Sequence, residues 1–236
     1  MSVTQEVRFE RPFLVSLRAL TVTIVALLAS TPVAAQSAFV GGETAPPTRL
    51  ERAYEIALAR SAAPASVSSE ATIYVLQGDD WVVAHEGTNG VVCWVTRSRP
   101  GSLEPHCFDE EGARTIVPIH MYEARRQLEG VPADQIDREV AEGIRSGKFR
   151  LPSRPVMSYM MSSGQILISD DGRNVGQWMP HLMIYYPYLE ADALGLGGEP
   201  STEAGLVVDP GTALSNLVIV VRDFVDPVDA GSESGR

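Results

Sequence analysis

Short runs of apolar and β-branched residues, bounded by turn residues, fill the middle and the end of this chain. Runs of this length with Gly, Pro, Asn or Asp at their ends are typical of β-strands. The run at 214–221 is almost wholly apolar, which indicates a strand buried in the sheet. The runs that we expect to be strands are residues 71–76, 81–86, 91–97, 106–109, 156–161, 165–169, 175–179, 181–186, 206–208 and 214–221.

The clearest turn in this pattern is Asn89-Gly90. A type I′ hairpin turn needs φ > 0 at both central residues, and Asn followed by Gly meets that need best. We therefore expect residues 81–86 and 91–97 to pair as an antiparallel hairpin. Together with the neighbouring strands they would form an antiparallel meander.

Apolar residues recur at helical spacing near the start of the strand region. Thr48 is expected to cap a helix that ends near Ser61 or Ala62, because Pro64 forbids much extension. Residues 66–69 are expected to be a loop.

A second helical stretch lies between the two groups of strands, at residues 118–147. Pro118 is expected to begin its first helix, which Gly130 and Pro132 end. Residues 133–146 are expected to form the next helix. The apolar face of that helix consists of Ile136, Val140 and Ile144.

Helices and antiparallel strands in separate parts of the chain predict an α+β fold. We expect one domain over residues 48–225, an antiparallel sheet with an N-terminal helix and an inserted helical pair at 118–147. Residues 36–47 are small, polar and rich in Pro and Gly, which indicates a flexible lead-in. Residues 226–236 are expected to be a disordered tail.

Residues 1–35 have the pattern of a secretory signal peptide. A basic start with Arg11 and Arg18 precedes an uncharged apolar run at 19–29, and small residues at 33–35 suit cleavage. The apolar run is much shorter than the roughly 20 residues of a membrane span. We therefore expect an exported protein, periplasmic or extracellular, that keeps no stable membrane anchor after cleavage.

The chain is acidic, with a net charge of −11 at pH 7, and 44% of its residues are hydrophobic. It would repel a phosphate backbone, and no cluster of Lys and Arg offers a local exception, so nucleic acid is not an expected partner. The expected partner is a small molecule or a protein of unknown identity. Cys93 and Cys107 are expected to form a disulfide in an oxidising compartment, with a thiol nucleophile or metal ligand as the alternative.

The expected strand register predicts which side chains face one another. The hairpin places His85 opposite Trp94, and a Cys93–Cys107 disulfide then places Trp94 opposite His106. In this row the two imidazoles lie on alternate strands, roughly 9.6 Å apart, with an indole between them. A metal bonds its ligand atoms at about 2 Å, so bridging this gap past the indole is awkward for one ion. The row is therefore interpreted as a half-buried sheet face or a pocket wall.

The candidate ligand-binding residues also include Tyr159 and His181, which opens an apolar strand. His120 and Glu123 are interpreted as a solvated pair on one helix face, since H-E-x-x-H is absent. The full candidate set is His85, Trp94, His106, Tyr159 and His181.

Methionines concentrate in the second group of strands and, with histidine, could hold Cu(I). Filling of the core is the preferred interpretation, so neither a metal nor a cofactor is expected. Serine-nucleophile, P-loop and dinucleotide motifs do not occur. The methionines are Met157, Met160, Met161, Met179 and Met183.

Several segments, taken together, resemble a group of uncharacterised exported bacterial proteins. The similarity spans about residues 70–221, and this chain departs from the group by the helical stretch around 118–147. The resemblance implies an exported single domain and no known activity. The segments are E-G-T-N-G-x-x-C at 86–93, C-F-D at 107–109, S-Y-M at 158–160, P-H-L-M at 180–183, and P-G-T at 210–212 with the run at 217–221.

The function expected first is a binding or accessory module for a small molecule or a partner. The alternative is a hydrolase-type enzyme in which His181 acts as a base beside a carboxylate, Asp109 or Glu86. A third hypothesis is a structural or interaction protein, which an exposed patch at 185–188 would favour. The catalytic residues are unknown, and whether the protein is an enzyme stays open.

Overall fold

The computed structural model describes residues 49–169, 171–196 and 205–228. The helices are α1 (Arg52–Arg60), α2 (Ala65–Ser68), α3 (Glu110–Leu128), α4 (Ala133–Arg145) and the short 3₁₀-helix η1 (Asp192–Leu194). The strands are β1 (Thr72–Gln77), β2 (Asp80–His85), β3 (Val92–Thr96), β4 (Glu104–Phe108), β5 (Val156–Met160), β6 (Leu167–Ile168), β7 (Asn174–Gly176), β8 (His181–Tyr185), β9 (Leu206–Val208) and β10 (Asn216–Val220).

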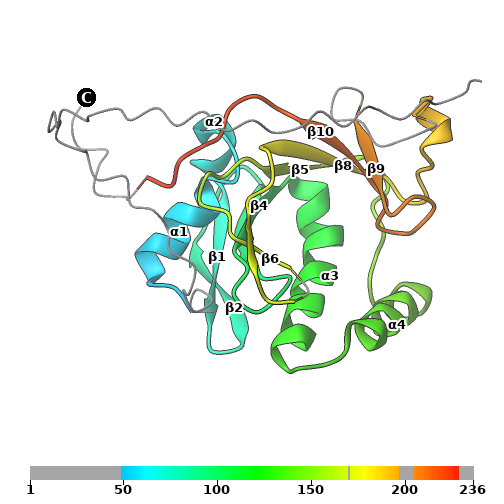
Figure 1. The fold of residues 1–236 in the computed structure, drawn as a ribbon, viewed down its shortest axis with the longest axis horizontal. Helices are drawn as coiled ribbons and strands as arrows, with labels where there is room; N and C mark the ends of the chain where they lie inside the picture. The colour runs from blue at the N-terminus through cyan, green and yellow to red at the C-terminus, as the bar shows by residue number, and fades with distance from the viewer. Residues whose placement is uncertain (1–48, 170, 197–204, 229–236) are drawn as a thin grey trace, which may run out of the picture. The chain divides into compact units, whose positions relative to one another are not determined.

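An eight-stranded sheet in the order β2-β1-β3-β4-β5-β8-β10-β9 forms the centre of the fold. α1 packs on one face, against β1, β3 and β4, and α3 packs on the other, against β3, β4 and β5 (Figure 1). Most strand pairs are antiparallel, which confirms the α+β prediction. The expected signal peptide at 1–35 and lead-in at 36–47 lie outside the described residues.

The hairpin predicted at Asn89-Gly90 is wrong. β2 pairs with β1 instead, with His85 opposite Ile73. β3 then runs parallel to β1, with Ile73 opposite Cys93. The chain therefore leaves β2, passes the start of β1 and enters the sheet on the far side of β1.

The segment at 86–90 makes this crossing and is hydrogen-bonded to the first residue of β1 and to the chain just before it. The Gly87 amide donates to the Thr72 hydroxyl at 3.0 Å. The Thr88 amide donates to the Glu70 carbonyl oxygen at 2.8 Å, and the Thr88 hydroxyl donates to the Glu70 carboxylate at 3.0 Å. The E-G-T-N-G segment at 86–90 therefore has a structural role, because its hydrogen bonds position the crossing chain against the start of β1.

The register between β3 and β4 is the one expected. Cys93 and Cys107 form a disulfide with a Cα–Cα distance of 4.1 Å, and Trp94 lies opposite His106. Both cysteines are fully buried on the α1 side of the sheet. The closed loop spans a sequence separation of 14 residues, which contributes about 3 kcal/mol in the chain-entropy model.

α1 begins later than expected, because Glu51 provides its cap by accepting a hydrogen bond from the Tyr54 amide at 3.0 Å. Thr48, the expected cap, lies outside the described residues. The helix ends at Arg60, close to the expected end. α2 replaces the loop expected at 66–69.

α3 begins well before Pro118, the residue expected to begin it. Asp109 caps the helix by accepting from the Gly112 amide at 2.8 Å, and Pro118 lies inside the helix on its exposed side. An interior proline costs an isolated helix about 3 kcal/mol. Packing on the sheet offsets this cost, since Ile116 and Ile119 are fully buried. α4 agrees with the second predicted helix.

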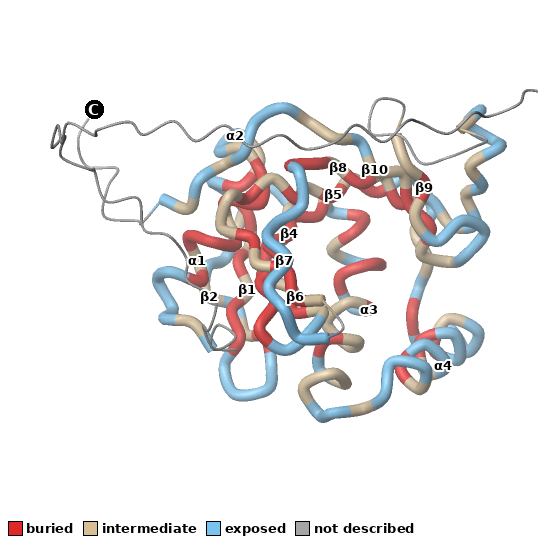
Figure 2. Tube along the Cα trace, viewed as in Figure 1, coloured by how far each residue is buried: buried red, intermediate tan, exposed pale blue. Residues whose placement is uncertain are grey.

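The end of the sheet is more exposed than expected. β10 was predicted to be buried, but Ile219 is 38% exposed because it projects from the face opposite α3, one strand from the sheet edge. β6 and β7 pair with each other, and β7 is exposed along its length whereas β4 is buried throughout (Figure 2).

Within the described residues, no helix has both the length and the apolar character needed to cross a membrane.

Candidate functional site: a buried histidine layer

A layer of polar and aromatic side chains lies between the sheet and α3. Successive strand residues point to opposite faces. Cys107 packs toward α1, so its neighbours His106 and Phe108 face α3. His181 on β8 pairs with Met160, which packs in the same cluster as Phe108. We use "histidine layer" for His106 and His181 on the sheet together with His120 on α3, whose ring lies against that of His106.

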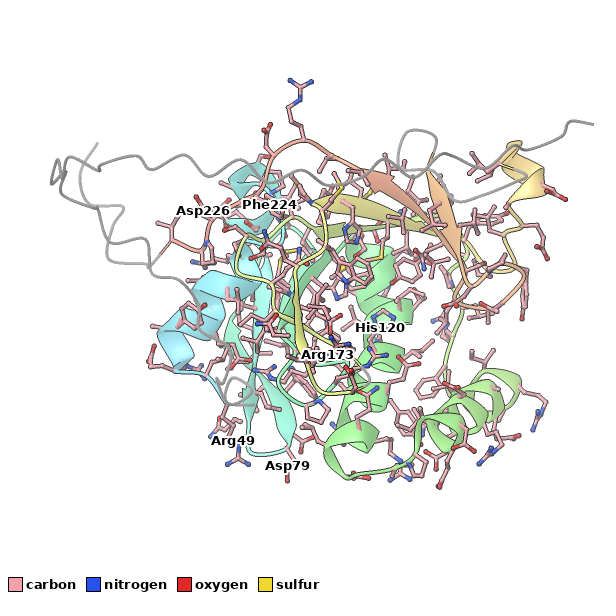
Figure 3. The ribbon with its side chains drawn as sticks, viewed as in Figure 1. Arg49, Asp79, His120, Arg173, Phe224 and Asp226 are labelled. Carbon is pink, nitrogen blue, oxygen red and sulfur yellow. A yellow bond between two sulfur atoms is a disulfide. The ribbon has the colours of Figure 1, made fainter. Side chains whose placement is uncertain are left out.

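Ring contacts join the layer across the interface. His120 is on α3 (Figure 3), and its ring centroid lies 6.2 Å from that of His106. The His120 ring also lies 5.6 Å from Phe108 and 5.9 Å from Tyr185, both in edge-to-face geometry. The helix histidine therefore packs against side chains from two strands, β4 and β8.

Each strand histidine uses one ring nitrogen in a hydrogen bond. His106 Nδ1 lies 2.9 Å from the Thr96 hydroxyl, and His181 Nδ1 donates to the Met179 carbonyl oxygen at 2.7 Å. Among the described residues, His106 Nε2 and His120 Nδ1 are buried and have no hydrogen-bond partner. His106 is 6% exposed. Buried polar atoms without partners are uncommon and mark places where a ligand or water can bind.

Burial keeps the histidine layer neutral at pH 7. It lowers the pKa of His120 to about 4 and lowers the pKa of His181. It also holds the pKa of His106 well below the ordinary value, with smaller contributions from His120 and His181. Neutral imidazoles are acceptors and metal ligands, whereas imidazolium ions are neither.

The interpretation of His120 and Glu123 as a solvated pair is wrong, because both are partly buried against the sheet side of α3. Burial is the main cause that raises the pKa of Glu123 to about 7. The carboxylates of Asp137 on α4 and Asp209 after β9 add to that rise.

We expect Glu123→Gln to change the pH dependence of stability. A carboxyl with a pKa of about 7 in the fold and 4.5 as its ordinary value binds more protons when folded. Stability therefore falls as the pH rises from about 4.5 to about 7, and it stays reduced above that range. The variant lacks this fall and should be more stable than wild type by roughly 1–3 kcal/mol at pH 8.

Urea denaturation at closely spaced pH values measures this effect. Because both proteins keep all their histidines, subtracting the two stability curves isolates the contribution of Glu123. A difference that is the same at pH 4 and at pH 8 would contradict the raised pKa.

The structure brings together only part of the predicted candidate set. Trp94, His106 and His181 share the α3 face of the sheet. His85 lies at the exposed end of the edge strand β2, so the predicted row of His85, Trp94 and His106 is wrong at its first member. Tyr159 lies on the opposite face, where it packs against the cluster around the disulfide.

His120 is the member of the layer that sequence reasoning missed. Its signal is helical spacing, since Ile116, His120 and Ala124 fall on one face of a helix. That face is visible only if the helix begins before Pro118. A helix that begins at Pro118 leaves Ile116 outside it, so the face that Ile116 shares with His120 is not predicted.

A separate hollow of about 430 Å³ lies between α3 and α4. Glu139 in its lining accepts from Arg126 and from Tyr122, both at 2.8 Å, and hydrogen bonds from Arg126, Gln135 and Tyr122 lower the pKa of Glu139 to about 2. The Lys148 ammonium lies 4.1 Å from the centre of the Tyr122 ring. The hollow is lined by Tyr122, Gln135, Arg138, Glu139, Glu142, Gly143, Ser146 and Lys148, and it contains none of the predicted candidates.

Over the part of the chain that the structure describes, no three His, Cys, Asp or Glu side chains converge closely enough to hold a metal ion. Comparison of the chain with protein-family models, with curated protein sequences and with solved structures finds no match. The resemblance to exported bacterial proteins therefore stays a prediction.

Proposed function

We propose that this protein is an exported binding module that holds a small ligand in the histidine layer. The observation that carries the proposal is the pair of buried imidazole nitrogens without partners, His106 Nε2 and His120 Nδ1, on rings 6.2 Å apart. Each such atom costs about 1–3 kcal/mol when it is left unsatisfied. A ligand that bonds to both recovers that free energy.

The leader pattern at 1–35 and the Cys93–Cys107 disulfide support export. Disulfides persist in oxidising compartments and are rare where thiols are kept reduced. The disulfide also fixes β3 against β4, the strands that carry Trp94 and His106. Because the disulfide cross-links the two strands, Trp94 and His106 are held in place before a ligand binds, which reduces the entropy lost on binding.

The hydrolase hypothesis required His181 to lie within hydrogen-bond reach of a carboxylate. In the described structure its Nδ1 instead donates to the Met179 carbonyl oxygen. Asp109, one of the two expected partners, caps α3 through Gly112 and pairs with Arg154 at 3.2 Å. Neither His181 nor Asp109 therefore gives geometric support to the hydrolase hypothesis.

The interaction-protein hypothesis rested on the aromatic patch at 185–188. Tyr185 is buried, whereas Tyr186 and Tyr188 are 50% and 59% exposed. Two exposed tyrosines are common on soluble surfaces. This hypothesis stays a prediction.

Native mass spectrometry of protein purified from the exported fraction of a bacterial host tests the proposal. Wild type should carry a bound mass, and His120→Phe, which keeps ring shape but removes the buried nitrogen, should not. His85→Gln is the matched control on the exposed edge strand and should keep the mass. A wild type without bound mass, or a mass that survives in both His106→Phe and His120→Phe, would overturn the proposal.

A further inference from the structure

We propose that the ligand of the histidine layer is a soft monovalent metal ion, Cu(I), held by His106, His120 and the thioether of Met160. This inference rests on the proposed function and names the ligand class of the same site. It replaces the expectation of no metal, which considered the row of His85, Trp94 and His106, because the structure removes His85 from that row and brings His120 against His106.

A methionine lies on the side of His106 away from Trp94, on the neighbouring strand β5. In the β4–β5 register Phe108 pairs with Ser158 and Cys107 with Tyr159. Extending that register by one residue places Met160 across from His106. Met160 in turn pairs with His181 on β8. The two strand histidines are thus on alternate strands with a thioether between them. A thioether sulfur is itself a metal ligand, so this row has a donor between its two histidines, whereas the predicted row of His85, Trp94 and His106 had an indole there.

The distance between the His106 and His120 rings suits one shared ion. An imidazole nitrogen bonds to a metal at about 2 Å, so two imidazoles on opposite sides of one ion have ring centroids about 6 Å apart. The observed separation is 6.2 Å. Both rings keep a buried nitrogen without a protein partner in the described residues.

In the two strand histidines the second ring nitrogen has the kind of partner that metal-ligating histidines use. Such histidines bond through their second nitrogen to a carbonyl, carboxylate or other polar group, which fixes the ring orientation and leaves the first nitrogen for the ion. His106 has the Thr96 hydroxyl, and His181 has the Met179 carbonyl oxygen. Because Nδ1 of His181 carries the proton, its Nε2 is the nitrogen that can accept a hydrogen bond or bind a metal. His181 lies on β8, next to Met160.

The donor set favours Cu(I) over zinc. Zinc sites are built from thiolate, imidazole and carboxylate, and both cysteines of this chain are in the disulfide. Thioether and imidazole are donors that select Cu(I). Met160 is 3% exposed, and a single positive charge costs less to bury than a double one.

Anaerobic titration of the full disulfide-bonded protein with Cu(I), with ascorbate as reductant and bicinchoninate as competitor, tests the inference. Wild type should bind one Cu(I), and X-ray absorption should show sulfur and nitrogen neighbours. Met160→Leu conserves volume, so the fold should survive. It should lose the sulfur neighbour and weaken binding by about tenfold or more. Met157→Leu, on the same strand but the opposite sheet face, is the matched control and should behave as wild type.

The outcomes separate this inference from the proposed function. Failure of wild type to bind Cu(I) in a stoichiometric amount overturns the inference, as does binding that Met160→Leu and His120→Phe leave unchanged. If wild type fails to bind Cu(I) yet carries an organic mass that His120→Phe removes, the inference fails and the proposed function stands. If wild type carries neither, both fail.

Discussion

Glu55→Gln is expected to lower the free energy of unfolding by about 3–5 kcal/mol at pH 7, the usual cost of breaking a buried ion pair from one side. Glu55 and Arg97 form that pair on the α1 side of the sheet, with their side chains 1% and 2% exposed. The carboxylate oxygen lies 2.9 Å from the guanidinium and also accepts from the Leu76 amide at 3.0 Å. The variant keeps the size of the side chain and removes the negative charge that faces the buried guanidinium.

Urea denaturation of wild type and variant measures this effect. Asp134→Asn is the control, because Asp134 pairs with Arg138 on the exposed face of α4, with side chains 72% and 68% exposed. Exposed pairs of this kind contribute about 0.5 kcal/mol or less. Equal losses in the two variants would show that burial of the Glu55–Arg97 pair has no special effect.

Gly87→Ala is expected to destabilise the protein by about 3 kcal/mol or more, at the upper end of what overpacking costs. A Cβ atom at position 87 would lie 2.5 Å from the Glu70 carbonyl oxygen and closer still to the backbone of Ala71 and Thr72. These atoms belong to the main chain at the start of β1, so no side-chain rotation relieves the overlap. The crossing segment would have to leave β1, and the Gly87 amide would lose its bond to Thr72.

Thermal and urea denaturation of purified variants measure the loss. Gly78→Asn is the control: Gly78 lies in the β1–β2 turn with φ +66° and no atom within 4 Å of a Cβ at that position. Asparagine tolerates this left-handed conformation, so that variant should stay near wild-type stability. If Gly87→Ala is as mild as the control, the close approach of the crossing segment to β1 is wrong.

The local pattern of the sequence was enough to predict most strands. Period-2 alternation and turn residues located β1, β2, β3, β5 and β8 to within a residue or two, since these signals depend only on neighbours in the chain. Cysteine count and the expected compartment predicted the Cys93–Cys107 disulfide, and the disulfide in turn predicted that Trp94 faces His106. The disulfide and the pairing of Trp94 with His106 are both confirmed.

The wrong hairpin at Asn89-Gly90 shows that neighbouring residues alone do not determine which strands pair. A two-residue hairpin and a crossing segment use the same kinds of turn residue, and Gly90 does adopt the positive φ that the hairpin needs. The side chain of Asn89, however, donates to the Val67 carbonyl oxygen at 2.8 Å, a residue far away in sequence. That long-range contact belongs to the crossing and not to a hairpin.

The sequence by itself determined the period of each element, the positions of the strands and the covalent link between β3 and β4. Tertiary structure decided the order of the strands and, through it, which side chains share the α3 face. Alternation assigns a residue to one of two faces, but only the pairing of distant strands chooses its neighbours. Met160 came to lie between His106 and His181 by that choice, and His120 joined them because packing on the sheet sustains α3 through Pro118.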